Sequence, residues 1–93
     1  MALSQTHLKG ELDVANAEHL ERELRRVESS DALTIVLDLS DLQFIDSTGV
    51  RMLFLAHARS LADSNRLALL RGPKTVQRVF ELTGIHDRLP FAD

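Results

Sequence analysis

The residues of this chain best able to do chemistry lie close together, between Asp38 and Gly49. Three carboxylates, those of Asp38, Asp41 and Asp46, are followed directly by the hydroxyl of Ser47. Carboxylates near the carboxyl end of a parallel strand can hold Mg²⁺ for phosphotransfer. A serine at the start of a helix can instead be a site of phosphorylation. The spacing therefore leaves two kinds of phosphate chemistry open.

The three aspartates also have a simpler interpretation, which we favour. Asp38 and Asp41 can accept hydrogen bonds within a loop, and Asp46 can cap a helix. The only downstream lysine, Lys74, follows a Gly-Pro turn and not a strand, which weakens the Mg²⁺-dependent phosphotransfer alternative. His57 lies on the apolar side of the helix expected next, and we interpret it as a partly buried packing residue and not as a catalytic base.

The tetrad from Asp46 to Gly49 lies where the apolar pattern changes from that of a strand to that of a helix. Its short polar side chains can cap unpaired helix amides, so Ser47 is by pattern alone a capping hydroxyl. A phosphate on Ser47 would meet these amides and the positive end of the helix dipole, with Arg51 one turn later, whereas Asp41 and Asp46 would repel it. Its larger effect should fall on a docking partner, which would meet about two additional negative charges.

The order of elements is expected to be β-α-β-α-β-α-β, which predicts an α/β fold with a mainly parallel sheet. A first strand paired antiparallel would make this sheet mixed. Gly10 suggests a bulge in the first strand, and Asn16 is expected to cap the first helix. The expected strands cover about 6–12, 33–39, 66–70 and 88–91, and the expected helices about 17–27, 47–62 and a short segment after Pro73 that ends before Gly84.

Composition excludes several classes of protein. The 93 residues include no cysteine, tryptophan or tyrosine and carry a net charge of −3, which argues against thiolate metal sites, nucleic-acid binding and attraction to anionic membranes. No apolar run approaches the ~20 residues of a membrane helix, and the N-terminus lacks the pattern of a signal peptide. The common glycine-rich phosphate loops are absent. We expect one cytoplasmic domain over residues 1–93, without enzymatic activity or cofactor.

Three segments resemble the STAS domain, the family of anti-sigma factor antagonists. They are the stretch 10–13, the long stretch 36–50 that contains Asp-Ser-Thr-Gly, and the stretch 79–85. The resemblance implies a small mixed, mainly parallel sheet of about four strands packed by three helices. Compared with the family pattern, the chain is expected to lack the usual extra N-terminal strand and C-terminal helix.

The resemblance also implies a function and its residues. In the family, the serine after the aspartate of this motif, here Ser47, is phosphorylated by a partner anti-sigma factor serine kinase, and Thr48 is the second choice. The unphosphorylated antagonist binds the anti-sigma factor and so releases a sigma factor for transcription, and a phosphoserine phosphatase restores this state. The residues implied in partner binding and switching are Asp13, Asn16, Asp41, Asp46, Ser47, Thr48, Gly49 and Arg51.

Two further interpretations remain open. STAS-like domains also occur as accessory parts of transporters, of lipid-transport systems and of stress-signalling assemblies, in which the serine need not be phosphorylated. A short chain is in addition expected to leave a sheet edge open, which favours pairing of two copies as a homodimer. A segment trimmed from a longer protein would be equally short.

Overall fold

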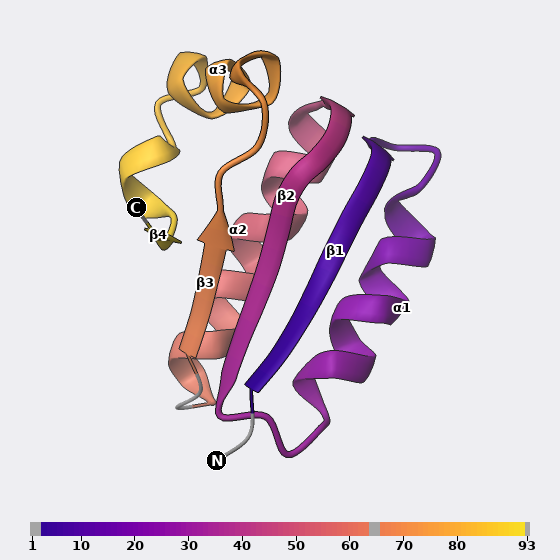
Figure 1. The fold of residues 1–93 in the computed structure, drawn as a ribbon, viewed down its shortest axis with the longest axis vertical. Coiled ribbons are helices and arrows are strands. Elements are labelled where there is room, and N and C mark those ends of the chain that lie inside the picture. The colour runs from indigo at the N-terminus through magenta and orange to yellow at the C-terminus, as the bar shows by residue number, and fades with distance from the viewer. Residues whose placement is uncertain (1–2, 64–65, 93) are drawn as a thin grey trace.

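The computed structural model describes residues 3–63 and 66–92 of the chain. Strands and helices alternate along the described residues (Figure 1). The elements are β1 (Leu3–Leu12), α1 (Ala17–Glu28), β2 (Thr34–Ile45), α2 (Ser47–Ala62), β3 (Arg66–Leu70), α3 (Lys74–Leu82), the 3₁₀ helix η1 (His86–Arg88) and β4 (Phe91–Ala92).

The four described strands form one sheet in the order β1-β2-β3-β4, and every neighbouring pair is parallel. The expected α/β architecture of about four strands and three helices is therefore confirmed. The expectation of a mixed sheet is corrected, because β1 pairs with β2 in parallel. A helix between successive strands returns the chain to the end at which the preceding strand began, so each new strand runs in the same direction.

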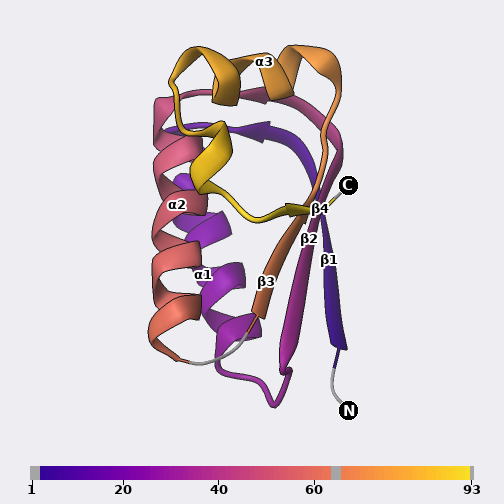
Figure 2. The ribbon, with the colours of Figure 1, turned by 90° about the vertical axis from the view of Figure 1, so that its left-hand side faces the viewer.

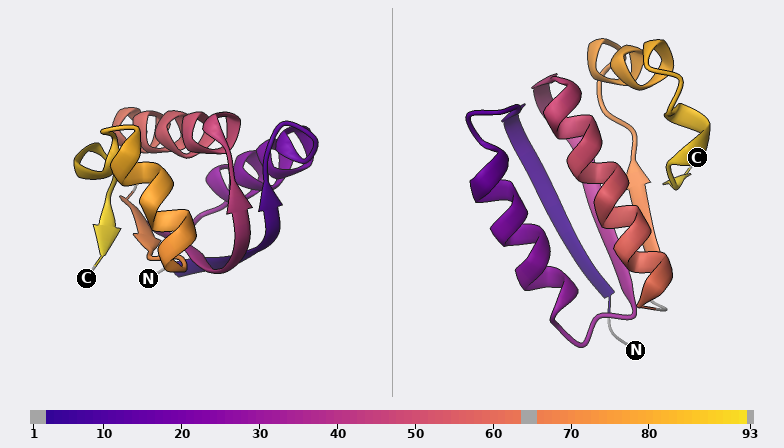
Figure 3. Two further views of the ribbon diagram at one scale, coloured as in Figure 1. Left: turned by 90° about the horizontal axis from the view of Figure 1, so that it is seen from above. Right: turned by 180° about the vertical axis from the view of Figure 1, so that it is seen from behind.

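Both long helices cover the same face of the sheet. Figures 2 and 3 show α1 and α2 side by side on one face, with α3 across the end of the sheet at which β2 finishes. The core lies between these layers, and its members include the side chains of Leu37, Leu39, Leu53, Leu69 and Phe80, each with no exposed surface. Over the described residues, no helix covers the opposite face, and β1 is an edge strand.

β2 is longer than its apolar sequence predicts. It continues for twelve residues to Ile45 and does not end near residue 39, so Asp38 and Asp41 lie within a strand and not in a loop. Pairing with β1 continues beyond the acidic residues to Ile45, and Leu42 and Ile45 remain buried there, although their spacing of three residues is not the alternation of a regular strand. β1 follows the whole length, with register shifts that include one at Gly10, whose φ of 74° confirms the predicted irregularity.

The helix boundaries agree with those predicted from the periodicity, but one predicted helix cap is not observed. α2 and β3 match the expected ranges, and α1 begins after Asn16. Asn16 nevertheless makes no side-chain capping bond. Its side-chain amide turns back instead and donates to the carbonyl oxygen of Glu11 and to Oδ1 of Asp13. Between the helices, Arg59 of α2 donates to both carboxylate oxygens of Glu28 of α1, at 2.7 and 2.9 Å.

Candidate partner-binding site

Ser47 is the first residue of α2 and is exposed to solvent. The preceding Asp46 has an extended backbone, and its Oδ1 accepts a hydrogen bond from the Gly49 amide at 3.1 Å. The cap predicted for Asp46 is therefore present, whereas Ser47, which the pattern suggested as a capping hydroxyl, is the first residue of the helix and not its cap. The hydroxyl of Ser47 lies at the N-terminus of a sixteen-residue helix, which is the positive end of the helix dipole. Backbone amides at this end have no partner within the helix.

Gly49 brings the first turn of α2 against the end of β1. A Cβ atom at Gly49 would lie 2.3 Å from the carbonyl oxygen of Leu12 and 2.8 Å from the side chain of Ile45. The same Leu12 oxygen accepts a hydrogen bond from the Asp46 amide at 3.2 Å. Only a glycine allows this approach, so its place in the tetrad has a packing reason. The sequence offered no signal for this contact.

Asp46 also joins α2 to the loop that follows β1. Its Oδ2 accepts a hydrogen bond from the amide of Val14 at 3.3 Å. Oδ1 of Asp13 accepts from both the backbone and the side-chain amide of Asn16, each at 3.1 Å, so this loop is held in a defined shape. Val14 presents 73% of its surface to solvent between these anchors. The predicted loop and the predicted helix start are therefore brought together, and Val14 is an exposed apolar residue that the sequence analysis did not single out.

The remaining predicted residues of the helix start differ in exposure. Thr48 is half-buried, whereas Ser47 is exposed, so the first hydroxyl is the more accessible acceptor. Arg51 is exposed on the same turn and forms no ion pair with any residue that the structure describes. It is available to a negative group at the start of α2.

Asp41 is placed differently from the residues of the tetrad. Its Oδ2 lies 3.5 Å from Nε2 of His7 on β1, and Oδ2 of Asp38 lies 3.0 Å from the same nitrogen. Oδ1 of Asp38 accepts from the Ser40 amide at 2.9 Å. Sequence reasoning missed His7, because nothing in its local spacing indicates that β1 places it opposite Asp38.

This arrangement removes the basis of the magnesium interpretation. Asp38 and Asp41 face His7, whereas both carboxylate oxygens of Asp46 accept backbone amides at the helix start. Within residues 3–63 and 66–92, no group of three or more histidine or acidic side chains is arranged to hold a metal ion. The three carboxylates therefore do not form the single donor set that this alternative needs.

Asp38 is expected to stabilise the fold in a pH-dependent way. The hydrogen bonds from Ser40, the backbone one foremost, lower the pKa of the Asp38 carboxyl, and His7 contributes less in the same direction. A carboxyl whose pKa is lowered on folding contributes its full stabilisation at pH values above its pKa in the unfolded chain, about 3.9. This stabilisation is lost as the pH falls through the pKa of the folded chain. The loss in free energy of unfolding caused by Asp38→Asn should therefore shrink as urea titrations move from neutral to acidic pH. An equal loss at every pH would contradict this assignment.

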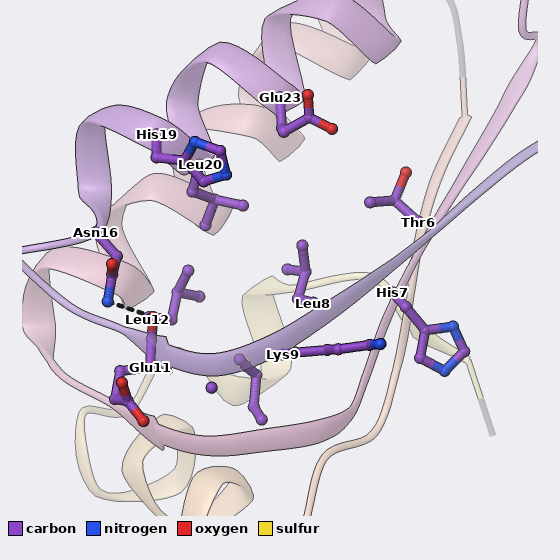
Figure 4. Close-up of a pocket in the computed structure, with 12 residues that line it drawn as sticks. Thr6, His7, Leu8, Lys9, Glu11, Leu12, Asn16, His19, Leu20 and Glu23 are labelled. Carbon is purple, nitrogen blue, oxygen red and sulfur yellow. Dashed lines mark hydrogen bonds between the residues drawn. The ribbon is translucent and has the colours of Figure 1, made fainter.

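A hollow of about 380 Å³ lies behind the loop, between the open edge of β1 and α1. Figure 4 shows Leu8 and Leu12 of β1 directed towards Leu20 and His19 of α1, with the bond from Asn16 closing one end. The floor of this hollow is apolar and its rim is polar. It runs along β1, the edge strand of the sheet.

Comparison with known proteins places this geometry in a family. The sequence model of the STAS domain matches residues 4–93. The chain belongs to the STAS domain family. Among curated STAS relatives, the putative anti-sigma factor antagonist BtrV of Bordetella bronchiseptica is 34% identical over 86 residues, which are 92% of this chain and 74% of BtrV.

Solved structures of STAS proteins share the fold. An anti-sigma factor antagonist from Mycobacterium paratuberculosis superposes with a TM-score of 0.85 at 24% identity, covering 97% of this chain and 76% of that one. The anti-sigma factor antagonist SpoIIAA in its unphosphorylated form gives 0.77 at 26% identity over 99% of this chain and 81% of its own. Bacillus SpoIIAA in its phosphorylated form gives 0.69 at 25% identity, over 98% and 83%. Among the described helices, none is long and apolar enough to span a membrane.

Proposed function

We propose that this STAS domain is an anti-sigma factor antagonist, a binding module without enzymatic activity that is switched by phosphorylation of Ser47. The observation that carries the proposal is the position of Ser47, which is exposed at the start of α2 and joined through Asp46 to the exposed loop 13–16. The names of BtrV and SpoIIAA support the antagonist role, and the solved phosphorylated form of SpoIIAA supports a modified state.

The site favours binding in the unmodified state. The loop 13–16 and the first turn of α2 form one surface, which we call the docking surface. It offers apolar Val14 and the small polar groups of Ser47 and Asp46. A partner can bury such a surface at low cost, because the Asp46 carboxylate already has two backbone donors. The unphosphorylated chain would bind the anti-sigma factor here and so release the sigma factor.

A phosphate on Ser47 would change the charge of this surface and leave the fold intact. The start of α2 and Arg51 compensate part of the charge, so the helix tolerates the group. The partner, however, would have to desolvate about two additional negative charges beside Asp46. The exposure of Ser47 would allow the anti-sigma factor serine kinase to add the phosphate and a phosphoserine phosphatase to remove it.

Charge at position 47, and not the loss of the hydroxyl, is expected to weaken binding to the partner. Ser47→Asp should weaken the complex with the cognate anti-sigma factor at least about tenfold, as expected when an unpaired charge is buried at an interface. Asparagine has nearly the shape of aspartate without its charge. Ser47→Asn and Ser47→Ala should therefore bind like the native chain. Calorimetric titration of the three variants measures the difference. Equal affinity of the Asp and Asn variants would refute the charge switch.

The modification itself is tested by intact-mass analysis. The chain is incubated with ATP and each candidate anti-sigma factor kinase of the same genome. We expect one added phosphate on the native chain and on Thr48→Ala, and none on Ser47→Ala. No phosphate with any candidate, or an unchanged phosphate on Ser47→Ala, would contradict the proposed acceptor.

A further inference from the structure

The outer edge of β1 has backbone groups that no described strand uses. Among the described strands, β1 pairs only with β2. The carbonyl oxygen of Leu12 lies on the paired side, since it accepts from the Asp46 amide just after β2. That of the preceding Glu11 lies on the outer side and accepts from Nδ2 of Asn16. Backbone groups alternate between the two edges of a strand, so the odd-numbered residues within 5–9 direct theirs outwards, where another strand could pair with them.

α1 extends over the space beside β1 in which a further strand would lie. Seen from behind in Figure 3, α1 lies outside β1, with no described strand beneath it. The hollow of about 380 Å³ lies between this helix and the strand edge, and its floor is formed by Leu8, Leu12 and Leu20 (Figure 4). Thr6 and Gly10 are smaller residues on the same side of β1, so the hollow continues along the strand. An apolar floor under a helix suits the inner side chains of an added strand.

β1 keeps the side-chain alternation that the addition of a strand requires. The register shift near its middle places the additional residue on β2, because the step from His7 to Lys9 is matched by the longer step from Asp38 to Asp41. Within 5–11, every odd-numbered side chain is exposed and every even-numbered one is at least partly buried. An added strand would therefore meet a regular edge, with one side facing solvent and the other facing α1.

Two charges on the exposed side of β1 define what the added strand should carry. Lys9 and Glu11 are exposed, and neither forms an ion pair within the part of the chain that the structure describes. Residues directly opposite each other on antiparallel strands interact, and opposite charges stabilise the pair. A basic residue is thus favoured opposite Glu11, and an acidic one two positions later, opposite Lys9. The residue between them would lie above Gly10, where a larger apolar side chain has room.

We propose that the space beside β1, which we call the edge slot, binds one extended segment of a partner protein as an antiparallel strand. The segment would carry apolar residues at every second position, facing α1, and a basic residue followed two positions later by an acidic one on the exposed side. Its backbone would pair with residues 5–9, because the bond from Asn16 to Glu11 ends the free edge. This inference does not depend on the phosphorylation of Ser47.

A second copy of this chain suits the edge slot less well than a single segment. Two copies related by a twofold axis would pair their β1 strands antiparallel and keep their helices on the same face of the joined sheet. Each α1 would then extend over the β1 of the other copy, where the helices of that copy already lie (Figure 3). A lone extended segment brings no helix to this edge and meets no such conflict.

The test uses two synthetic peptides with blocked ends, Lys-Val-Glu-Val-Thr-Val-Thr and its charge-swapped counterpart Glu-Val-Lys-Val-Thr-Val-Thr. Each is titrated into the ¹⁵N-labelled chain and followed by NMR. We expect saturable shifts of the β1 amides with the first peptide and slower exchange of the His7 and Lys9 amides with solvent. The swapped peptide should bind about tenfold more weakly, because it replaces two attractive cross-strand pairs by two repulsive ones.

Exchanging the two charges of the chain should reverse this preference. Lys9→Glu combined with Glu11→Lys changes only exposed side chains, and this variant should bind the swapped peptide more tightly. Lys74→Glu combined with Glu81→Lys is the matched control, because it makes the same exchange at exposed positions of α3, outside the edge slot, and should leave the native preference unchanged.

Three results would overturn the proposal. The first is the absence of saturable shifts with both peptides. The second is a preference between the peptides that is absent in the native chain or unchanged by the exchange at Lys9 and Glu11. The third is a dimer, detected by sedimentation at rising concentration, in which the β1 amides become protected without peptide, since the occupant would then be a second copy.

Discussion

Gly49→Ala is expected to lower the free energy of unfolding by about 3 kcal/mol, the upper part of the range for an overpacked site. The added methyl group would lie 2.3 Å from the Leu12 carbonyl oxygen, which is backbone and cannot rotate away. α2 must therefore move from the end of β1, which also disturbs the hydrogen bond between the Asp46 amide and Leu12. Urea denaturation of the variant and the native chain measures the loss.

Gly84→Ala is the matched control for this prediction. Gly84 has a φ of 72°, and a Cβ atom there would meet no atom within 4 Å, so the substitution adds backbone strain without a clash. Such strain costs about 1–2 kcal/mol. If Gly49→Ala destabilised the chain no more than Gly84→Ala, close packing between α2 and β1 would not be the reason for glycine in the tetrad.

Phe80→Ala is expected to have the other large effect on stability, with a loss of about 3–5 kcal/mol. Phe80 has no exposed surface and packs edge-on against Phe91, with ring centres 5.2 Å apart. The truncation removes buried apolar area and leaves a cavity between α3 and the sheet. It also removes the contact that holds Phe91, so the amides of β4 should exchange faster with solvent, as measured by hydrogen exchange.

Phe44→Ala makes the same truncation at a surface position. Phe44 lies near the end of β2 with half of its surface exposed, so its removal should cost well under half of the loss at Phe80. Similar losses at the two positions would mean that α3 is not part of the cooperative core.

The proposed docking surface lies at the carboxyl ends of the strands. The loop 13–16 follows β1, Ser47 follows β2, and the turn at Gly72 follows β3. Because these strands are parallel, their carboxyl ends lie at the same edge, which is where open α/β sheets present binding residues.

The sequence determined the features that depend on neighbours along the chain. The periodicity placed α2 and β3, the short polar side chain of Asp46 predicted its cap, and Gly10 predicted an irregular strand. Each of these depends on contacts within a few residues, so the local pattern contains the necessary information. The STAS family followed from the same stretch of residues that carries the tetrad.

Only the tertiary structure decided the contacts between distant segments. The parallel pairing of β1 placed His7 beside Asp38, and the extension of β2 removed the expected acidic loop. The bond between Val14 and Asp46, 32 residues apart, joined the loop to the helix. Asn16 turned away from its expected cap because Glu11 and Asp13 offered acceptors. These outcomes depend on how the strands align in the sheet, which local patterns of apolar and polar residues do not specify.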